Sequence, residues 1–193
     1  MNVYMLLDRS GSMESMWKEA INSINAYVNE LPGNTEVFLA VFDSISYEVA
    51  RNTTAKKWKD ISPEEFSPRG STPLYDSAAR LLWRAMDDNP EKAAFVVMTD
   101  GEENMSRNFN QTAVKILIAE AEAKKWQVIF LGANFDRVGD QASRVGLDST
   151  KFMNISAGNM GGSMRGLAAY TTAYAATGAA INLSDQDKFN AVK

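Results

Sequence analysis

The sequence predicts an α/β fold: an open, mostly parallel, doubly wound sheet of the Rossmann-like type, with helices on both faces and one antiparallel edge strand. Short apolar runs typical of buried strands alternate with segments of helical periodicity, which is the pattern of a parallel sheet with crossover helices. Two apolar runs, 36–43 and 46–50, are joined by a short turn at Ser44. So short a connection predicts a hairpin, and therefore one antiparallel strand at an edge of the sheet.

The first strand is predicted at residues 3–7, where the apolar run is continuous, as in a strand covered on both faces. It ends at Asp8, and Ser10 and Ser12 follow at steps of two, with Gly11 allowing a tight turn between them. One carboxylate and two hydroxyls thus leave one loop, and such hard oxygen atoms suit Mg²⁺, Ca²⁺ or Mn²⁺ better than a soft metal. The same residues also fit an ordinary loop in which Ser12 caps the next helix.

The remaining elements follow from the spacing of apolar residues along the chain. Helical spacing predicts helices over 13–31, 73–87, 112–125, 137–145 and 163–177. Apolar runs predict further strands over 93–99, 128–131 and 152–155.

Three stretches lack such periodicity. Residues 53–69 are irregular, and we expect apolar side chains such as Trp58 to pin them to the body. Residues 156–162 are rich in glycine and are interpreted as a linker. A chain of 193 residues favours one domain, which we expect to span 1–181 and to be followed by a polar C-terminal tail, 182–193, that frays.

Two later stretches carry polar side chains of the same kind as the first loop. Thr72 stands just before Pro73, which can open a helix. The predicted strand 93–99 is followed directly by Asp100. Together these residues form Asp-x-Ser-x-Ser, a distant Thr and a distant Asp at a second strand end. In open α/β sheets, ligands bind beyond the carboxyl ends of the strands, where the strand order reverses.

These three motifs resemble the metal-ion-dependent adhesion site (MIDAS) of von Willebrand factor A (vWA) domains. The resemblance covers nearly the whole chain, because the motifs fall in the family's order. The overall pattern is similar to the compact, stand-alone A domains of bacteria and their phages. It implies that Ser10, Ser12 and Thr72 are hydroxyl ligands of a divalent metal, Mg²⁺ above all, with Ca²⁺ or Mn²⁺ also possible. It implies that the carboxylates of Asp8 and Asp100 reach the ion largely through water.

The resemblance also implies a protein-binding module in which an Asp or Glu of a protein partner completes the metal's shell of six oxygens. A rival hypothesis is a Mg²⁺-dependent phosphoryl-transfer enzyme, which needs a nucleophile or base beside the metal. The residue two after Asp8 is Ser10 rather than a second Asp, and the chain has no His, so we expect no enzyme. A third hypothesis is a metal-free, structural A domain.

The composition excludes several other functions. The chain has no Cys and no His, which excludes disulfides, Ser-His-Asp triads and zinc sites built on these residues. Its net charge of −4 and the lack of a basic block argue against nucleic acid. The acidic pair Glu102 and Glu103 is expected to be surface charge. No apolar run approaches the ~20 residues that span a membrane. The first strand leaves no room for a signal peptide, so we expect a cytoplasmic protein, of open oligomeric state.

Overall fold

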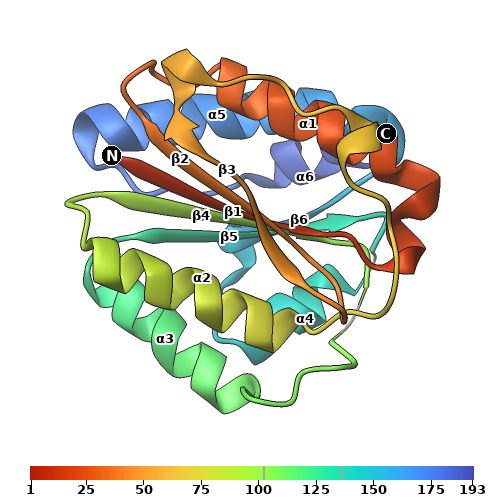
Figure 1. Cartoon of the computed structure of the whole chain (residues 1–193). Coiled ribbons are helices and arrows are strands. Elements are labelled where there is room, and N and C mark those ends of the chain that lie inside the picture. The colour runs from red at the N-terminus through yellow and green to blue at the C-terminus, as the bar shows by residue number, and fades with distance from the viewer. Residues whose placement is uncertain (102, 136) are drawn as a thin grey trace.

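The computed structural model describes residues 1–101, 103–135 and 137–193 and has one six-stranded sheet at its centre (Figure 1). Its strands are β1 (Asn2–Asp8), β2 (Glu36–Phe42), β3 (Tyr47–Thr54), β4 (Ala93–Thr99), β5 (Gln127–Ala133) and β6 (Phe152–Ile155). They lie in the order β3-β2-β1-β4-β5-β6. All neighbours pair in parallel except β2 and β3, which form the expected antiparallel hairpin at one edge. The predicted fold class is therefore confirmed.

Helices cover both faces of the sheet, with α1, α5 and α6 on one side and α2, α3 and α4 on the other (Figure 1). The α-helices are α1 (Trp17–Asn29), α2 (Leu74–Asp88), α3 (Gln111–Ala123), α4 (Val138–Arg144), α5 (Met160–Thr177) and α6 (Asp185–Ala191). Short 3₁₀ helices lie at Gly11–Met16, Ala55–Lys57, Pro63–Glu65, Ser149–Lys151 and Ala157–Asn159. In the described part of the chain, no helix is long and apolar enough to cross a membrane.

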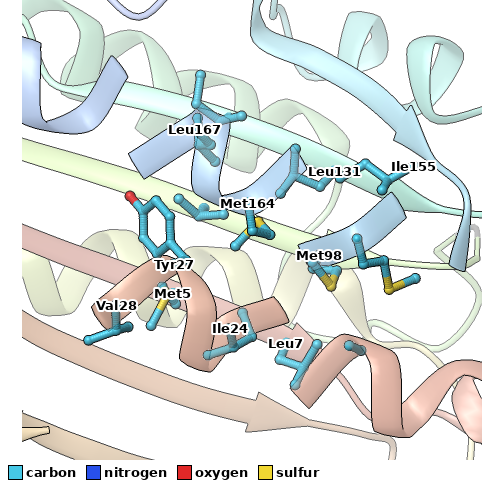
Figure 2. Packing of buried hydrophobic residues seen from close by; sticks show 14 of the residues in the cluster. Met5, Leu7, Ile24, Tyr27, Val28, Met98, Leu131, Ile155, Met164 and Leu167 are labelled. Carbon is cyan, nitrogen blue, oxygen red and sulfur yellow. The ribbon is translucent and has the colours of Figure 1, made fainter. Parts of the chain in front are cut away.

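The core consists of two apolar layers, one on each face of the sheet, because successive side chains of a strand point to opposite faces. In β1, Val3, Met5 and Leu7 join the layer under α1 and α5, while Tyr4 and Leu6 join the layer over α2 and α3. Figure 2 shows the first layer, where α1 (Ile24, Tyr27, Val28) and α5 (Met164, Leu167) meet the sheet (Met5, Leu7, Met98, Leu131, Ile155). Burial on both faces explains why the strand sequences are continuously apolar.

The strand order creates one place where a ligand site is expected. From β1 the chain moves outward to β2 and β3, and it then returns to β4 on the other side of β1. The order of strands therefore reverses between β1 and β4, and in open α/β sheets ligands bind beyond the carboxyl ends of the strands at such a point. Asp8 is the last residue of β1, and Asp100 follows directly after β4.

Three sequence-based expectations need correction. The first predicted helix begins as the 3₁₀ helix Gly11–Met16, and α1 starts only at Trp17. The expected linker 156–162 is mostly helical, because Gly161 and Gly162 lie inside α5. The expected polar tail 182–193 is largely helical, because Asp185–Ala191 form α6.

The helix α6 is stabilised by its cap and by apolar burial. Ser184 and Asp187 form a capping box at its start, which satisfies two backbone N–H groups. Leu183 and Ala191 are buried in the layer beneath α5. Ser156 N–H also donates to the Ala191 carbonyl at 2.9 Å, which ties the end of α6 to the end of β6.

Candidate metal centre

Asp8 is buried at the carboxyl end of β1, where it accepts hydrogen bonds from the end of β4 and from the loop after β1. The register pairs Leu7 with Met98, which places Asp8 beside Thr99 at the end of β4. Thr99 Oγ1 donates to Asp8 Oδ2 at 2.6 Å, and Ser10 N–H donates to Asp8 Oδ1 at 2.7 Å. The carboxylate is fully buried, so its position is set by the sheet and by these two hydrogen bonds.

Hydrogen bonds of Ser10 and Ser12 connect the carboxylate of Asp8 to that of Asp100. Ser10 Oγ and Ser12 Oγ are 3.1 Å apart, and Ser12 Oγ donates to Asp100 Oδ1 at 2.8 Å. Ser10 is buried and Ser12 is exposed, so the pair leads from the buried carboxylate of Asp8 to the protein surface. The structure therefore brings four of the five predicted ligands, Asp8, Ser10, Ser12 and Asp100, into one linked group.

The fifth predicted ligand, Thr72, lies on a third loop, which is hydrogen-bonded to the other two. Its N–H donates to Asn104 Oδ1 at 3.0 Å, and its carbonyl accepts from Asn104 N–H at 3.2 Å. Thr72 is only 2% exposed, and its Oγ1 lies 3.8 Å from the position that a Cβ on Gly101 would take. The hydroxyl thus faces the loop that carries Asp100. Thr72 does not cap α2, because the residue flanking this helix is Pro73.

Backbone contacts hold the third loop against the first. Gly11 N–H donates to the Gly70 carbonyl at 3.1 Å, and Arg69 N–H donates to the Arg9 carbonyl at 2.8 Å. Gly70 has φ of +68°, and a Cβ there would lie 2.5 Å from Ser44 Oγ. A residue with a side chain would therefore be strained at this position, so glycine is needed for the close approach of the loops.

Both carboxylates of the centre resist ionisation in the metal-free protein. Burial raises the pKa of Asp8 to about 6, although hydrogen bonds from Thr99 and Ser10 oppose the shift and the charge of Asp100 adds to it. Burial also raises the pKa of Asp100, against a hydrogen bond from Ser12. Among residues 1–101, 103–135 and 137–193, neither carboxylate forms an ion pair. Asp8 is buried and Asp100 is partly buried, and a bound cation would favour the ionised form of both neighbouring acids.

The donor set fits a hard divalent cation. All side-chain donors of the linked group are hydroxyl or carboxylate oxygens, the ligands that Mg²⁺ and Ca²⁺ take in proteins. Within the described residues, no group of three or more His, Cys, Asp or Glu side chains is placed to hold a metal. A metal at this centre would therefore depend on neutral hydroxyls beside its two carboxylates.

A buried ion-pair network that the sequence analysis missed supports the first loop. Arg9, which lies between Asp8 and Ser10 in the sequence, is only 3% exposed. Its Nε donates to Asp43 Oδ2 at 2.7 Å, and its Nη2 donates to Glu48 Oε1 at 2.8 Å. The network ties the loop after β1 to the hairpin of β2 and β3. The only signal in the sequence is an arginine directly after a buried strand, together with acidic residues in the hairpin.

Arg69 extends this network to the third loop. Its Nε donates to the same Oδ2 of Asp43 at 3.0 Å. Burial opposes the ionisation of Asp43, but hydrogen bonds from the N–H groups of Ser46 and Ile45, with Arg69 and Arg9 beside it, hold its pKa below the usual range. Asp43 is therefore a charged anchor between the loops that carry Ser10 and Thr72.

The loop after Asp100 is fastened to the start of α2 by two carboxylates. Asp76 accepts from the N–H groups of Arg107, Asn108 and Phe109 at 3.0, 3.0 and 2.7 Å. Glu103 Oε2 accepts from Tyr75 N–H at 2.8 Å, so this residue caps α2 and is not plain surface charge. The expectation for Glu102 lies outside the described residues. These contacts fix the loop of Asp100 relative to the helix that follows Thr72.

Comparison with known proteins gives the fold a name. No protein-family model and no curated protein matches this chain in sequence. Proximal thread matrix protein 1 (PTMP1) from the mussel byssus has a similar structure, with a TM-score of 0.69 and 14% identity over 89% of this chain and 48% of that one. A further PTMP1 structure, with a zinc-occupied MIDAS motif, has a TM-score of 0.65 and 15% identity over 86% of this chain and 46% of that one.

Two bacterial proteins are also similar in structure. The von Willebrand factor type A protein from Catenulispora acidiphila has a TM-score of 0.67 and 13% identity over 89% of this chain and 42% of that one. The vWF domain of the type V pili tip protein Mfa5 from Porphyromonas gingivalis has a TM-score of 0.67 and 11% identity over 89% of this chain and 95% of that one. The chain thus spans less than half of the PTMP1 and Catenulispora chains but nearly all of the Mfa5 domain. These likenesses show that the chain has the fold of von Willebrand factor A domains.

Proposed function

We propose that this protein is a metal-dependent protein-binding module. In this proposal Asp8, Ser10, Ser12, Thr72 and Asp100 hold a divalent cation, Mg²⁺ above all, and the cation recruits an Asp or Glu carboxylate of a protein partner. One observation carries the proposal: two carboxylates at the ends of neighbouring strands are linked through the hydrogen bonds of Ser10 and Ser12, and neither has an ion-pair partner in the described part of the chain. The cytoplasmic localisation expected above stays a prediction.

The carboxylates and the hydroxyls of the centre have different roles in this proposal. A bound cation supplies positive charge and an open coordination position for an anion. Asp8 and Asp100 provide the negative charge that holds it, while Ser10, Ser12 and Thr72 provide neutral oxygens that leave most of its charge unquenched. The zinc-occupied MIDAS of PTMP1 supports a divalent metal at the corresponding place in a protein of the same fold.

We expect Mg²⁺ to stabilise the fold. A ligand that binds only the native state adds RT ln(1 + [L]/Kd), which is about 2.7 kcal/mol at a hundredfold excess over Kd. Thermal melts in millimolar Mg²⁺ and in EDTA measure this difference. Asp100→Ala should remove it, whereas Asp87→Ala, which deletes an exposed carboxylate on α2, should keep it. Identical melts of the wild type in Mg²⁺ and EDTA would favour a metal-free domain instead.

We expect Thr72→Ala to weaken recognition much more than folding. The change removes one neutral ligand but keeps both carboxylates and leaves the cap of α2 intact, so the free energy of unfolding should fall by only about 1 kcal/mol. The affinity for an end-blocked glycine peptide with a single glutamate should fall roughly tenfold. NMR titration in Mg²⁺ measures this affinity. Thr72→Ser keeps the hydroxyl and is the matched control. Equal peptide affinity of the wild type, Thr72→Ala and Thr72→Ser would show that Thr72 is not a ligand of the metal.

A further inference from the structure

A polar cavity of about 230 Å³ borders the candidate metal centre. It lies between the turn after β2 and the first two turns of α2, and Pro73, the neighbour of Thr72, forms part of its wall. A single bound water needs only roughly 10–15 Å³ of such space, so the cavity has room for a side chain. Since Ser71 N–H also donates to Ser44 Oγ in its wall at 3.0 Å, the loop of Thr72 is continuous with the cavity.

Two arginines supply the charge that this cavity can offer to a ligand. Arg80 and Arg107 both line it, both are exposed, and neither forms an ion pair with any residue that the structure describes. The two acids in the wall are already used within the fold. Asp43 is bound by Arg9 and Arg69, and Asp76 accepts from three backbone N–H groups. The oxygens of both acids are therefore occupied within the fold, whereas the guanidinium groups of Arg80 and Arg107 can donate to a ligand.

Further side chains in the wall suit an incoming protein segment. The hydroxyl of Tyr47 is buried and has no hydrogen-bond partner among the described residues, which is costly unless a ligand or water supplies one. Ile45 and Met105 line the same cavity and are 69% and 39% exposed. Arginine, tyrosine and methionine are the residue types enriched in protein interfaces.

We propose that this cavity binds a second carboxylate of the same partner, so that the module recognises an acidic segment with two Asp or Glu residues. The inference rests on the proposed function, because the first carboxylate occupies the metal's open position beside Thr72. Arg80 lies six residues beyond Leu74, the first residue of α2, which is about 9 Å along the helix axis. An extended peptide covers this length in about three residues. The second carboxylate therefore stands about three positions from the first.

The test compares two peptides and four proteins by NMR titration in Mg²⁺ and in EDTA. One end-blocked glycine peptide carries a single glutamate, and the other carries a second glutamate three positions later. For the wild type in Mg²⁺, the second glutamate should tighten binding about fivefold, as one well-placed exposed ion pair would. Arg80→Gln and Arg107→Gln should each lose most of this gain without changing the affinity for the single-glutamate peptide. Arg165→Gln, which removes the same charge from α5 on the opposite face of the sheet, should keep the gain.

The outcomes separate this inference from the proposed function. If single-glutamate binding depends on Mg²⁺ but the second glutamate adds nothing, or if Arg165→Gln loses the gain as well, the cavity is not a carboxylate site. If binding of both peptides is the same in EDTA as in Mg²⁺, the proposed function fails. A wild type that binds neither peptide at millimolar concentration overturns both.

Discussion

Replacing Asp8 by asparagine should abolish the Mg²⁺-dependent rise in melting temperature and should stabilise the metal-free protein at neutral pH. Asp8 is fully buried, and burial raises its pKa to about 6 from an ordinary value of 3.8. Each unit of pKa shift corresponds to about 1.36 kcal/mol, so holding this carboxylate ionised at pH 7 costs up to about 3 kcal/mol of folding free energy. Asparagine removes the charge and therefore this cost.

Asparagine also fits the hydrogen bonds at this position. Its carbonyl oxygen can accept from Ser10 N–H, as Asp8 Oδ1 does, and its amide can donate to the hydroxyl of Thr99. The variant thus keeps the shape of the loop and loses only the negative charge that a cation needs. In Mg²⁺ the wild type should recover stability, and the variant should not.

The stability difference between the wild type and Asp8→Asn should depend on pH. The pKa of Asp8 is higher in the folded than in the unfolded protein. Its favourable contribution to the free energy of unfolding is therefore complete below about pH 4 and is lost as the pH rises through about 6. Urea denaturation of both proteins in EDTA should therefore show nearly equal stability at pH 4 and a growing advantage of Asp8→Asn toward pH 7. A variant less stable than the wild type by the same amount at every pH would show that the carboxylate is chiefly structural.

Replacing Arg9 by methionine should lower the free energy of unfolding by about 3 kcal/mol. Removing one partner of a buried ion pair typically costs 3–5 kcal/mol, because the other charge stays buried and uncompensated. Arg9 and Asp43 are both almost fully buried, and their Nε and Oδ2 atoms are 2.7 Å apart. The lower end of the range applies because Arg69 still reaches Asp43 at 3.0 Å. Affinity for Mg²⁺ should fall as well, since Arg9 holds the loop that carries Ser10.

Two controls define this prediction. Arg84→Met removes the exposed pair with Asp88 on α2, which has a similar distance of 2.9 Å, and should cost only about 0.3–0.5 kcal/mol. Adding Asp43→Asn to Arg9→Met should restore part of the lost stability, because the uncompensated charge disappears while Asn still accepts from Ile45 and Ser46 N–H. Urea denaturation measures all four proteins. A loss for Arg9→Met no larger than for Arg84→Met would contradict a structural role of the network.

The sequence by itself determined the class of fold and the strand ends that carry the polar motifs. Apolar runs that are continuous in strands and periodic in helices depend only on local spacing, so the alternation, the hairpin and the position of Asp8 at the end of β1 could be predicted. The same local information failed at 156–162 and 182–193. There glycine-rich and polar stretches become helical through a capping box and through burial against β6 and α5.

Only the tertiary structure decided which side chains meet at the candidate metal centre. Thr99 donates to Asp8 across 91 positions of sequence, and Arg9 reaches Asp43 across 34. Both contacts follow from the strand order, which places β4 and β2 on either side of β1, and no local pattern specifies that order. The cavity with Arg80 and Arg107 likewise forms where α2 and the loop after β4 come together. Contacts between distant segments depend on how the elements pack, which local periodicity does not encode.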